Sequence, residues 1–226
     1  MGRHADKLRK VRLNAPVSAD DIAGLELGTI VYLDGTVFTG REGVYKRAID
    51  DGVPLPIDPH QVSNVNFHCS PAAADNGDGT YRVGAVTATA SFRFAKWLDR
   101  WFEQTGTKVI IGKGGMNPTI YRDIFVKHGA IYLTTVGYGT GALLGRGIKN
   151  IRAAHWIEEL GIAQAMWVFD VENFGPFLVE SNLKGESLFE NTNAEIGKKI
   201  GSLYEGTTPP ALHRYGETDD RSDEVV

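Results

Sequence analysis

A hydroxyl, a guanidinium and an ammonium group are concentrated in the stretch from Thr87 to Met116. Thr89 and Arg93 are four residues apart, so a helix that begins near residue 90 would place both on one side of its first turn. Lys113 follows a short apolar strand and lies in a glycine-rich turn. In a parallel strand-helix-strand arrangement such a turn opens beside the start of the preceding helix. The three side chains can therefore converge on one anion.

A plainer interpretation of the same residues is equally open at this point. Arg93 and Lys113 can be solvated surface charges, Thr89 a helix cap, and the glycines a simple turn. The helix itself is well supported, because apolar residues recur at helical spacing on one face and charged residues occupy the other. The apolar set is Phe94, Trp97, Leu98, Trp101 and Phe102, the charged set is Lys96, Asp99, Arg100 and Glu103, and Gly106 ends the helix.

The composition indicates a globular chain with its own core. Of 226 residues, 42% are hydrophobic and 23% are charged, which suits one large domain or a domain with appendages. The net charge of −4 and the absence of a long basic stretch argue against nucleic acid as the main ligand. No apolar run approaches the roughly 20 residues that cross a bilayer, and the first residues do not resemble a signal peptide. We therefore expect a cytoplasmic protein without a membrane segment.

Cys69 is the single cysteine of the chain. One cysteine excludes an internal disulfide, and it excludes an iron–sulfur or zinc site that this chain would build from its own cysteines. If the protein works with such a metal centre, a partner must carry it.

The elements that precede this stretch predict an α/β fold. Residues 29–39 read as a hairpin or bulged strand, and Arg41 lies where this strand passes into a short helix over residues 42–51. The segments 62–69 and 81–88 flank an Asn-Gly-Asp-Gly turn and predict a hairpin. Its second strand leads directly into the stretch that carries the hydroxyl and the two cations.

The remaining elements complete one predicted domain over residues 1–205. From residue 206 onward, two prolines and many acidic residues predict a disordered, acidic tail up to residue 226. The other predicted elements are an edge strand at 11–13, a helix with a Ser18 capping box, a helix at 119–127, strands at 130–136, 166–171 and 178–180, and a closing helix at 193–204.

Gly137, Gly139 and Ala142 have the spacing of a dinucleotide-binding turn. The next strand has no acidic residue at its tip, where this use requires one. We favour the interpretation that these glycines allow close packing of a strand against a helix.

His155 and the neighbouring Glu158 and Glu159 are predicted on a helix that ends at Gly161. A histidine with carboxylates can be an acid/base set. A partly buried structural histidine is the interpretation we favour.

Several motifs, in this order, resemble the β subunit of the iron–sulfur hydro-lyases, the family of class I fumarases and L(+)-tartrate dehydratase. The similarity extends from about residue 25 to residue 200. It is carried by Thr39-Gly40-Arg41 with Lys46-Arg47, by Thr89-x-Ser91-x-Arg93, by the segment Glu103 to Met116, by His155-Trp156 with Glu159-Leu160-Gly161, and by Phe174-Gly175-Pro176.

The resemblance implies a swivelling β/β/α domain with a mixed sheet and flanking helices. It also implies an α subunit whose cysteines hold a 4Fe-4S cluster, in a heterodimer or a dimer of heterodimers, and the lone Cys69 agrees with that division. The implied reaction is reversible addition of water across the C=C bond of a small dicarboxylate, fumarate/malate or tartrate/oxaloacetate. The partner's open iron would act as a Lewis acid on the departing hydroxyl.

The resemblance also implies roles for single residues. Arg41, Arg93 and Lys113 would bind the substrate carboxylates, a task that suits planar guanidinium groups and a point-charge ammonium. Thr89 falls on the family's proposed base for the C–H proton and is the expected catalytic residue.

The chain departs from the family beside this base. Thr87-Ala88 and Ala90 stand where Gly-Pro and a second Thr are usual, and Tyr45 stands where a histidine is common. These differences change the backbone freedom and the hydroxyl groups near the base, so the identity of the dicarboxylate stays open.

Two other functions stay open beside the hydro-lyase. One is a non-catalytic carboxylate-binding module that keeps the pocket, and the other is an NAD-linked oxidoreductase. A neighbouring reading frame with three cluster-type cysteines would favour the hydro-lyase, and its absence would favour the module.

Overall fold

The computed structural model describes residues 8–137, 139–203 and 205–206. The backbone divides into two units, Met1–Asn191 and Thr192–Val226, and the predicted site residues belong to the first. Residues 207–226 hold nearly all of the predicted tail and lie outside the described residues, so the tail and the 1–205 domain boundary stay predictions.

The strands of the described residues form a seven-stranded mixed sheet in the order β1-β2-β3-β6-β7-β9-β8 and a separate hairpin, β4-β5. Their bounds are β1 Lys10–Ala15, β2 Ile30–Thr39, β3 Val65–Phe67, β4 Cys69–Asp75, β5 Tyr81–Ala88, β6 Val109–Gly112, β7 Ile131–Thr135, β8 Ile148–His155 and β9 Met166–Ser181. Neighbouring strands pair in parallel from β1 through β2, β3 and β6 to β7. In contrast, β9 is antiparallel to β2, β7 and β8. Because β9 pairs with both β2 and β7, the strands β2, β3, β6, β7 and β9 close into a barrel. The predicted α/β fold with a mixed sheet is confirmed.

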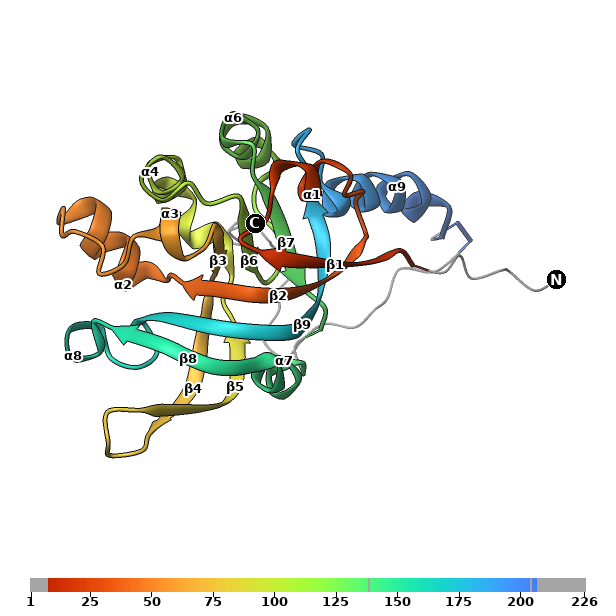
Figure 1. Ribbon diagram of the computed structural model, residues 1–226. Coiled ribbons are helices and arrows are strands. Elements are labelled where there is room, and N and C mark those ends of the chain that lie inside the picture. The colour runs from red at the N-terminus through yellow and green to blue at the C-terminus, as the bar shows by residue number, and fades with distance from the viewer. Residues whose placement is uncertain (1–7, 138, 204, 207–226) are drawn as a thin grey trace, which may run out of the picture. The chain divides into compact units, whose positions relative to one another are not determined.

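Helical segments connect and cover these strands. They are α1 Ala19–Ala23, α2 Glu42–Tyr45, η1 Lys46–Asp50, α3 Pro59–Val62, η2 Ser91–Phe94, α4 Ala95–Thr105, α5 Pro118–Ile120, η3 Tyr121–Phe125, α6 Val126–His128, α7 Gly141–Gly147, α8 Ile157–Leu160 and α9 Leu188–Leu203. Figure 1 shows α2, α3, α4 and α6 along one side of the sheet, while the β4-β5 hairpin extends away on the side of α7. None of the described helices is long and apolar enough to cross a membrane.

Successive side chains of the parallel strands point to opposite faces of the sheet and so contribute to two separate apolar cores. Val65 and Phe67 of β3 pack into the barrel interior, so Asn66 between them faces the helices. Tyr132 of β7 likewise packs among the helices, where it shares a core with Tyr45 of the α2 segment. Strands covered on both faces explain the continuous apolar runs in the sequence. The same geometry places polar groups of the strands beneath the helices.

The helix that follows Thr89 is amphipathic as predicted, but its regular α-helical part begins later than predicted. A 3₁₀ turn, η2, comes first and α4 follows it. Trp97 and Trp101 are buried, as their spacing predicts, and Gly106 ends the helix in the left-handed conformation with φ 63°. The short turn matters for the site, because it moves the regular helix away from Thr89.

One strand prediction is wrong in its pairing and another in its extent. The segment 62–69 does not pair with 81–88 as a whole, since Val65–Phe67 joins the barrel and only Cys69–Asp75 pairs with β5. The predicted strands 166–171 and 178–180 are parts of one strand, β9, whose pairing with β2 is irregular opposite Leu33. Long-range pairing across the barrel holds the Gly-Pro segment of β9 in the sheet, although these residues signal a turn locally.

Candidate functional site

Three parallel strands end at one edge of the barrel, and each is followed by a segment with a predicted site residue or its support. β2 leads to Arg41, β3 leads to His68 and Cys69, and β6 leads to Lys113. Carboxyl ends of parallel strands are the usual location of ligand sites in α/β folds, because the loops there converge.

Thr89 is inserted between the ends of β3 and β6. Its N–H donates to the carbonyl of His68 at 2.7 Å, and its carbonyl accepts the N–H of Lys113 at 3.2 Å. The residue is 7% exposed. The N-cap position of the following turn is Ala90, without a side-chain cap, so Thr89 is not the helix cap that its position allowed. The backbone brings Thr89 and Lys113 together.

Arg41 and Arg93 lie near enough for their positive charges to repel each other. Burial lowers the pKa of the half-buried Arg41, and the neighbouring Arg93 charge lowers it further. The guanidinium of Arg41 donates to the carbonyl of Ala163 at 2.9 Å, while its buried Nε has no hydrogen-bond acceptor among the described residues. An anion placed between the two guanidinium groups would relieve both the repulsion and the unpaired donor.

Arg93 itself is exposed, and its guanidinium carbon lies 5.6 Å from the centre of the Phe94 ring. The predicted position on the first helical turn is correct, although that turn is 3₁₀. An exposed guanidinium binds an anion strongly only when a further surface excludes water from it.

Lys113 lines a cavity of about 220 Å³ beside this edge. The wall includes Thr87 from β5, Thr135 from the end of β7, and Thr140 before α7. An ammonium with several hydroxyl groups suits a ligand that combines a carboxylate with hydroxyl groups.

Sequence reasoning missed a set of buried polar residues beneath these loops. Tyr45 Oη lies 2.6 Å from His68 Nε2, and His68 Nδ1 lies 2.7 Å from Ser91 Oγ. Tyr132 donates to Ser91 Oγ at 2.9 Å. Only two signals were available: Ser91 lies within a family motif, and Tyr45 replaces the common histidine. His68, Ser91 and Tyr132 are far apart in the chain, so their spacing gave no sign of contact.

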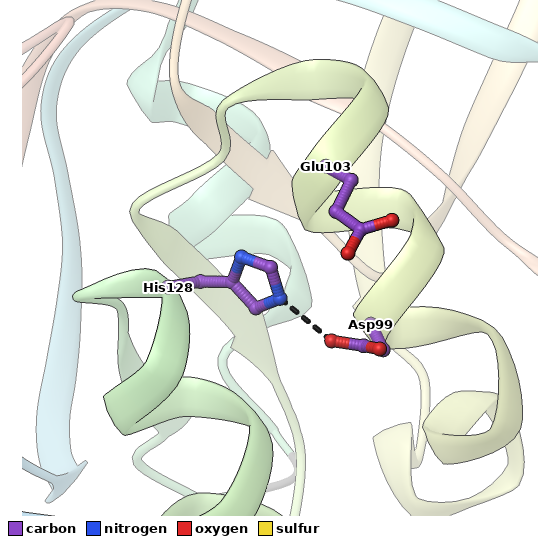
Figure 2. A group of neighbouring side chains, drawn as sticks. All are labelled: Asp99, Glu103 and His128. Atoms are coloured by element: carbon purple, nitrogen blue, oxygen red, sulfur yellow. Dashed lines mark hydrogen bonds and ion pairs between the residues drawn. The ribbon is translucent and has the colours of Figure 1, made fainter.

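The other titratable clusters do not contribute to this edge. In Figure 2, His128 Nε2 points at Asp99, 2.7 Å away, with Glu103 nearby. These three residues could hold a cation by distance alone, but Lys127 Nζ already contacts Asp99 at 2.7 Å and Glu103 at 3.2 Å. The ammonium balances the carboxylates, and we interpret the cluster as a solvated charge network between α4 and α6.

His155 is the last residue of β8 rather than part of a helix, so that prediction is wrong. Glu159 pairs instead with Arg47, at 3.0 Å. No hydrogen bond joins His155 to Glu158 or Glu159 within the described part of the chain. The structural interpretation of this histidine is the better one.

Two glycines of α7, Gly141 and Gly145, allow close packing. A Cβ at Gly141 would lie 3.1 Å from the carbonyl oxygen of Val86, and one at Gly145 would overlap the carbonyl of Gly84. The helix therefore lies directly on β5 at Gly141 and Gly145. The packing interpretation is wrong for Gly137 and Gly139, the glycines with the dinucleotide spacing, because a Cβ at either would meet open space.

The chain does not have the ligands of an iron–sulfur cluster. Cys69 is its single cysteine, it is buried, and burial raises the pKa of its thiol well above the usual value. A cluster of this type needs several thiolates, so these residues cannot hold one by themselves.

Several known proteins with similar sequences are hydro-lyases or their subunits. The L(+)-tartrate dehydratase subunit beta of Escherichia coli is 32% identical over 193 residues, which cover 85% of this chain and 93% of the relative. A putative L(+)-tartrate dehydratase subunit beta of Methanocaldococcus jannaschii is 30% identical over 81% of this chain and 93% of its own length. A putative fumarate hydratase class I of Geobacillus stearothermophilus is 26% identical over 87% of this chain, which corresponds to 37% of that protein. The model of the fumarase C-terminus family matches residues 2–192, and the chain therefore belongs to this family.

Proposed function

We propose that this hydro-lyase β subunit works with a cluster-bearing α subunit to add water to, or remove it from, the C=C bond of a small dicarboxylate. The substrate pair is fumarate/malate or tartrate/oxaloacetate. The names of the relatives support a hydro-lyase, and two of them name a separate subunit beta. The choice between the two pairs needs an experiment.

One observation carries the proposal. Arg41 has a buried Nε without a hydrogen-bond acceptor in the described residues, and its pKa is lowered by burial and, to a lesser extent, by the neighbouring Arg93 charge. Two close guanidinium groups with an unsatisfied donor favour an anionic ligand. A dicarboxylate can place one carboxylate here and the other near Lys113.

Thr89 is the proposed catalytic residue. Its Oγ1 would accept the substrate C–H proton during dehydration and return it during hydration. A neutral hydroxyl is a weak base, so the role requires cations that stabilise its alkoxide or a carboxylate that receives the proton. Arg93 and Lys113 are the neighbouring cations in this chain. The two backbone hydrogen bonds of Thr89 hold its backbone in place, and efficient proton transfer requires such a fixed position of the reacting group.

The partner completes the site in this proposal. Arg93 is exposed in the isolated chain and would lose its water when an α subunit covers this edge. We propose that the α subunit holds the 4Fe-4S cluster, that the two form a heterodimer or a dimer of heterodimers in the cytoplasm, and that this chain is the swivelling β/β/α domain of the assembly.

Anaerobic co-purification tests the proposal. The complex is screened against fumarate, malate, L(+)-tartrate and mesaconate by the absorbance of the C=C bond or of the oxo-acid product. We expect turnover of at least one dicarboxylate. A complex with an intact cluster that binds these acids without turnover would instead indicate a carboxylate-binding module.

A further inference from the structure

Five polar side chains form one buried hydrogen-bonded chain beneath the loops of the site. All five are 0% exposed: Asn66, Tyr45, His68, Ser91 and Tyr132. They come from two barrel strands, from α2, from the segment after β3 and from η2. A buried polar group is costly unless it is paired, so the chain depends on complete pairing.

The direction of each hydrogen bond can be derived from one end. Asn66 Nδ2 donates to the carbonyl of Phe38 at 3.3 Å, which leaves Oδ1 to accept the hydroxyl proton of Tyr45 at 3.0 Å. A hydroxyl has one proton. The oxygen of Tyr45 must therefore accept a proton from His68, which makes Nε2 the protonated nitrogen of the imidazole.

The other half of the chain follows from this tautomer. A neutral imidazole with its proton on Nε2 has an acceptor at Nδ1, and Ser91 donates its hydroxyl proton to it over 2.7 Å. Ser91 Oγ in turn accepts the proton of Tyr132 at 2.9 Å. Each of the three hydroxyl groups and the imidazole N–H has an acceptor, and His68 is the group that joins the two halves.

The buried hydrogen-bonded side chains contact each loop that carries a predicted site residue. Asn66 Nδ2 lies 3.1 Å from where a Cβ on Gly40, next to Arg41, would stand. Ser91 belongs to the Thr89–Arg93 segment, and a Cβ on Gly112, next to Lys113, would overlap its Oγ. The backbone carbonyl of His68 also holds the N–H of Thr89.

We propose that His68 is a positioning residue, which as the neutral Nε2–H tautomer fixes Ser91 and with it the segment that carries Thr89. The consequence for catalysis rests on the proposed hydro-lyase function. The positioning itself does not, because it concerns contacts within this chain. His68 acts through Ser91 and does not touch the substrate.

Two amide substitutions separate positioning from simple filling of space. The side-chain oxygen of His68→Asn can stand where Nδ1 stands and keep the Ser91 hydroxyl as donor, whereas His68→Gln reaches toward Tyr45 and leaves Ser91 without its acceptor. In the reconstituted complex we expect His68→Gln to lower kcat by about tenfold or more at a nearly unchanged KM, and His68→Asn to stay within about threefold, since small displacements of a reacting group are costly. Ser91→Ala should resemble His68→Gln.

A space-filling role predicts the reverse order, because Gln is larger than Asn and leaves the smaller void. Equal losses in both variants, or a larger loss in His68→Asn, would overturn the proposal. The comparison is made at a temperature well below the melting temperature of each variant.

Amide hydrogen exchange on the isolated full chain provides the second readout. We expect exchange at Thr89 and Lys113 to accelerate at least about tenfold in His68→Gln and Ser91→Ala, with little change in His68→Asn. Unchanged exchange in all three variants would refute the positioning role. If the exchange pattern holds while the wild-type complex turns over no dicarboxylate, the proposed function fails and the positioning role of His68 stands.

Discussion

At the scale of single residues, the hydroxyl of Thr89 decides whether this chain takes part in proton transfer. We expect Thr89→Val to lower kcat by about 10²–10⁴-fold while the cluster of the complex stays intact. Valine keeps the shape of the side chain, and Thr89 caps no helix in the structure, so the melting temperature should change little. Exchange of the substrate C–H hydrogen with D₂O should fall in step with turnover. Exchange at the wild-type rate would show that the proton leaves by another route.

Arg93 provides a test of the substrate-binding role. In the complex, Arg93→Ala should cost roughly 2–5 kcal/mol in kcat/KM if its pair with a substrate carboxylate is desolvated, against under about 1 kcal/mol for a charge that stays at the rim. Arg93→Lys should restore little, because an ammonium does not reproduce a bidentate guanidinium contact. Steady-state kinetics distinguishes the cases. A variant within a few-fold of wild type would place Arg93 outside the site.

His68 gives the stability of the chain a pH dependence. Burial lowers its pKa from 6.5 to about 3, so below pH 6.5 the unfolded chain binds a proton that the folded chain does not. The free energy of unfolding should therefore fall as the pH drops from 6.5 toward 3, by about 2 kcal/mol between pH 7 and pH 5 from this group alone. Denaturant unfolding at both pH values measures it. His68→Asn is the control, and a pH dependence equal to that of wild type would contradict the assignment.

At the scale of elements, α7 depends on glycine for its contact with β5. A Cβ at Gly145 would overlap the backbone of Gly84, whereas a Cβ at Gly84 would meet open space. We expect Gly145→Ala to lower the free energy of unfolding by about 1–3 kcal/mol, because the helix must move off the strand. Gly84→Ala should stay within about 0.5 kcal/mol. Thermal and denaturant unfolding of the two variants compare them, and equal effects would be inconsistent with close packing of α7.

Local sequence signals predicted some elements correctly and failed for others. The Ser18 capping box is present as predicted, and the apolar face of α4 is buried. The pairing of β9 was missed because a Gly-Pro pair signals a turn when it is read alone. In the barrel this segment is held by β2 on one side and by β7 on the other.

At the scale of the whole molecule, the single cysteine predicts that iron–sulfur chemistry depends on a partner. The purified chain should be colourless and inactive, and anaerobic co-expression with an α subunit should give a brown complex with the broad absorbance of a cluster. Absorption spectra and iron analysis of the chain with and without its partner provide the measurement. Hydration of fumarate or dehydration of tartrate by the chain alone, without iron, would refute the division of labour.

The sequence by itself determined the chemistry that is available and the elements that carry it. Residue types defined the hydroxyl at Thr89, the cations at Arg41, Arg93 and Lys113, and the lack of cluster ligands, because these properties belong to single side chains. Helical periodicity and Gly106 defined the helix after the site, since its contacts lie within a few residues.

Only the tertiary structure decided how these groups meet. The insertion of Thr89 between His68 and Lys113 depends on hydrogen bonds between segments that are distant in the chain. His68 meets Tyr45 and Ser91 across 23 residues in each direction, and Tyr132 meets Ser91 across 41. No local pattern encodes such contacts, because they arise from strand register and barrel closure. The residues that could react were visible in the sequence, and the buried chain that holds them was not.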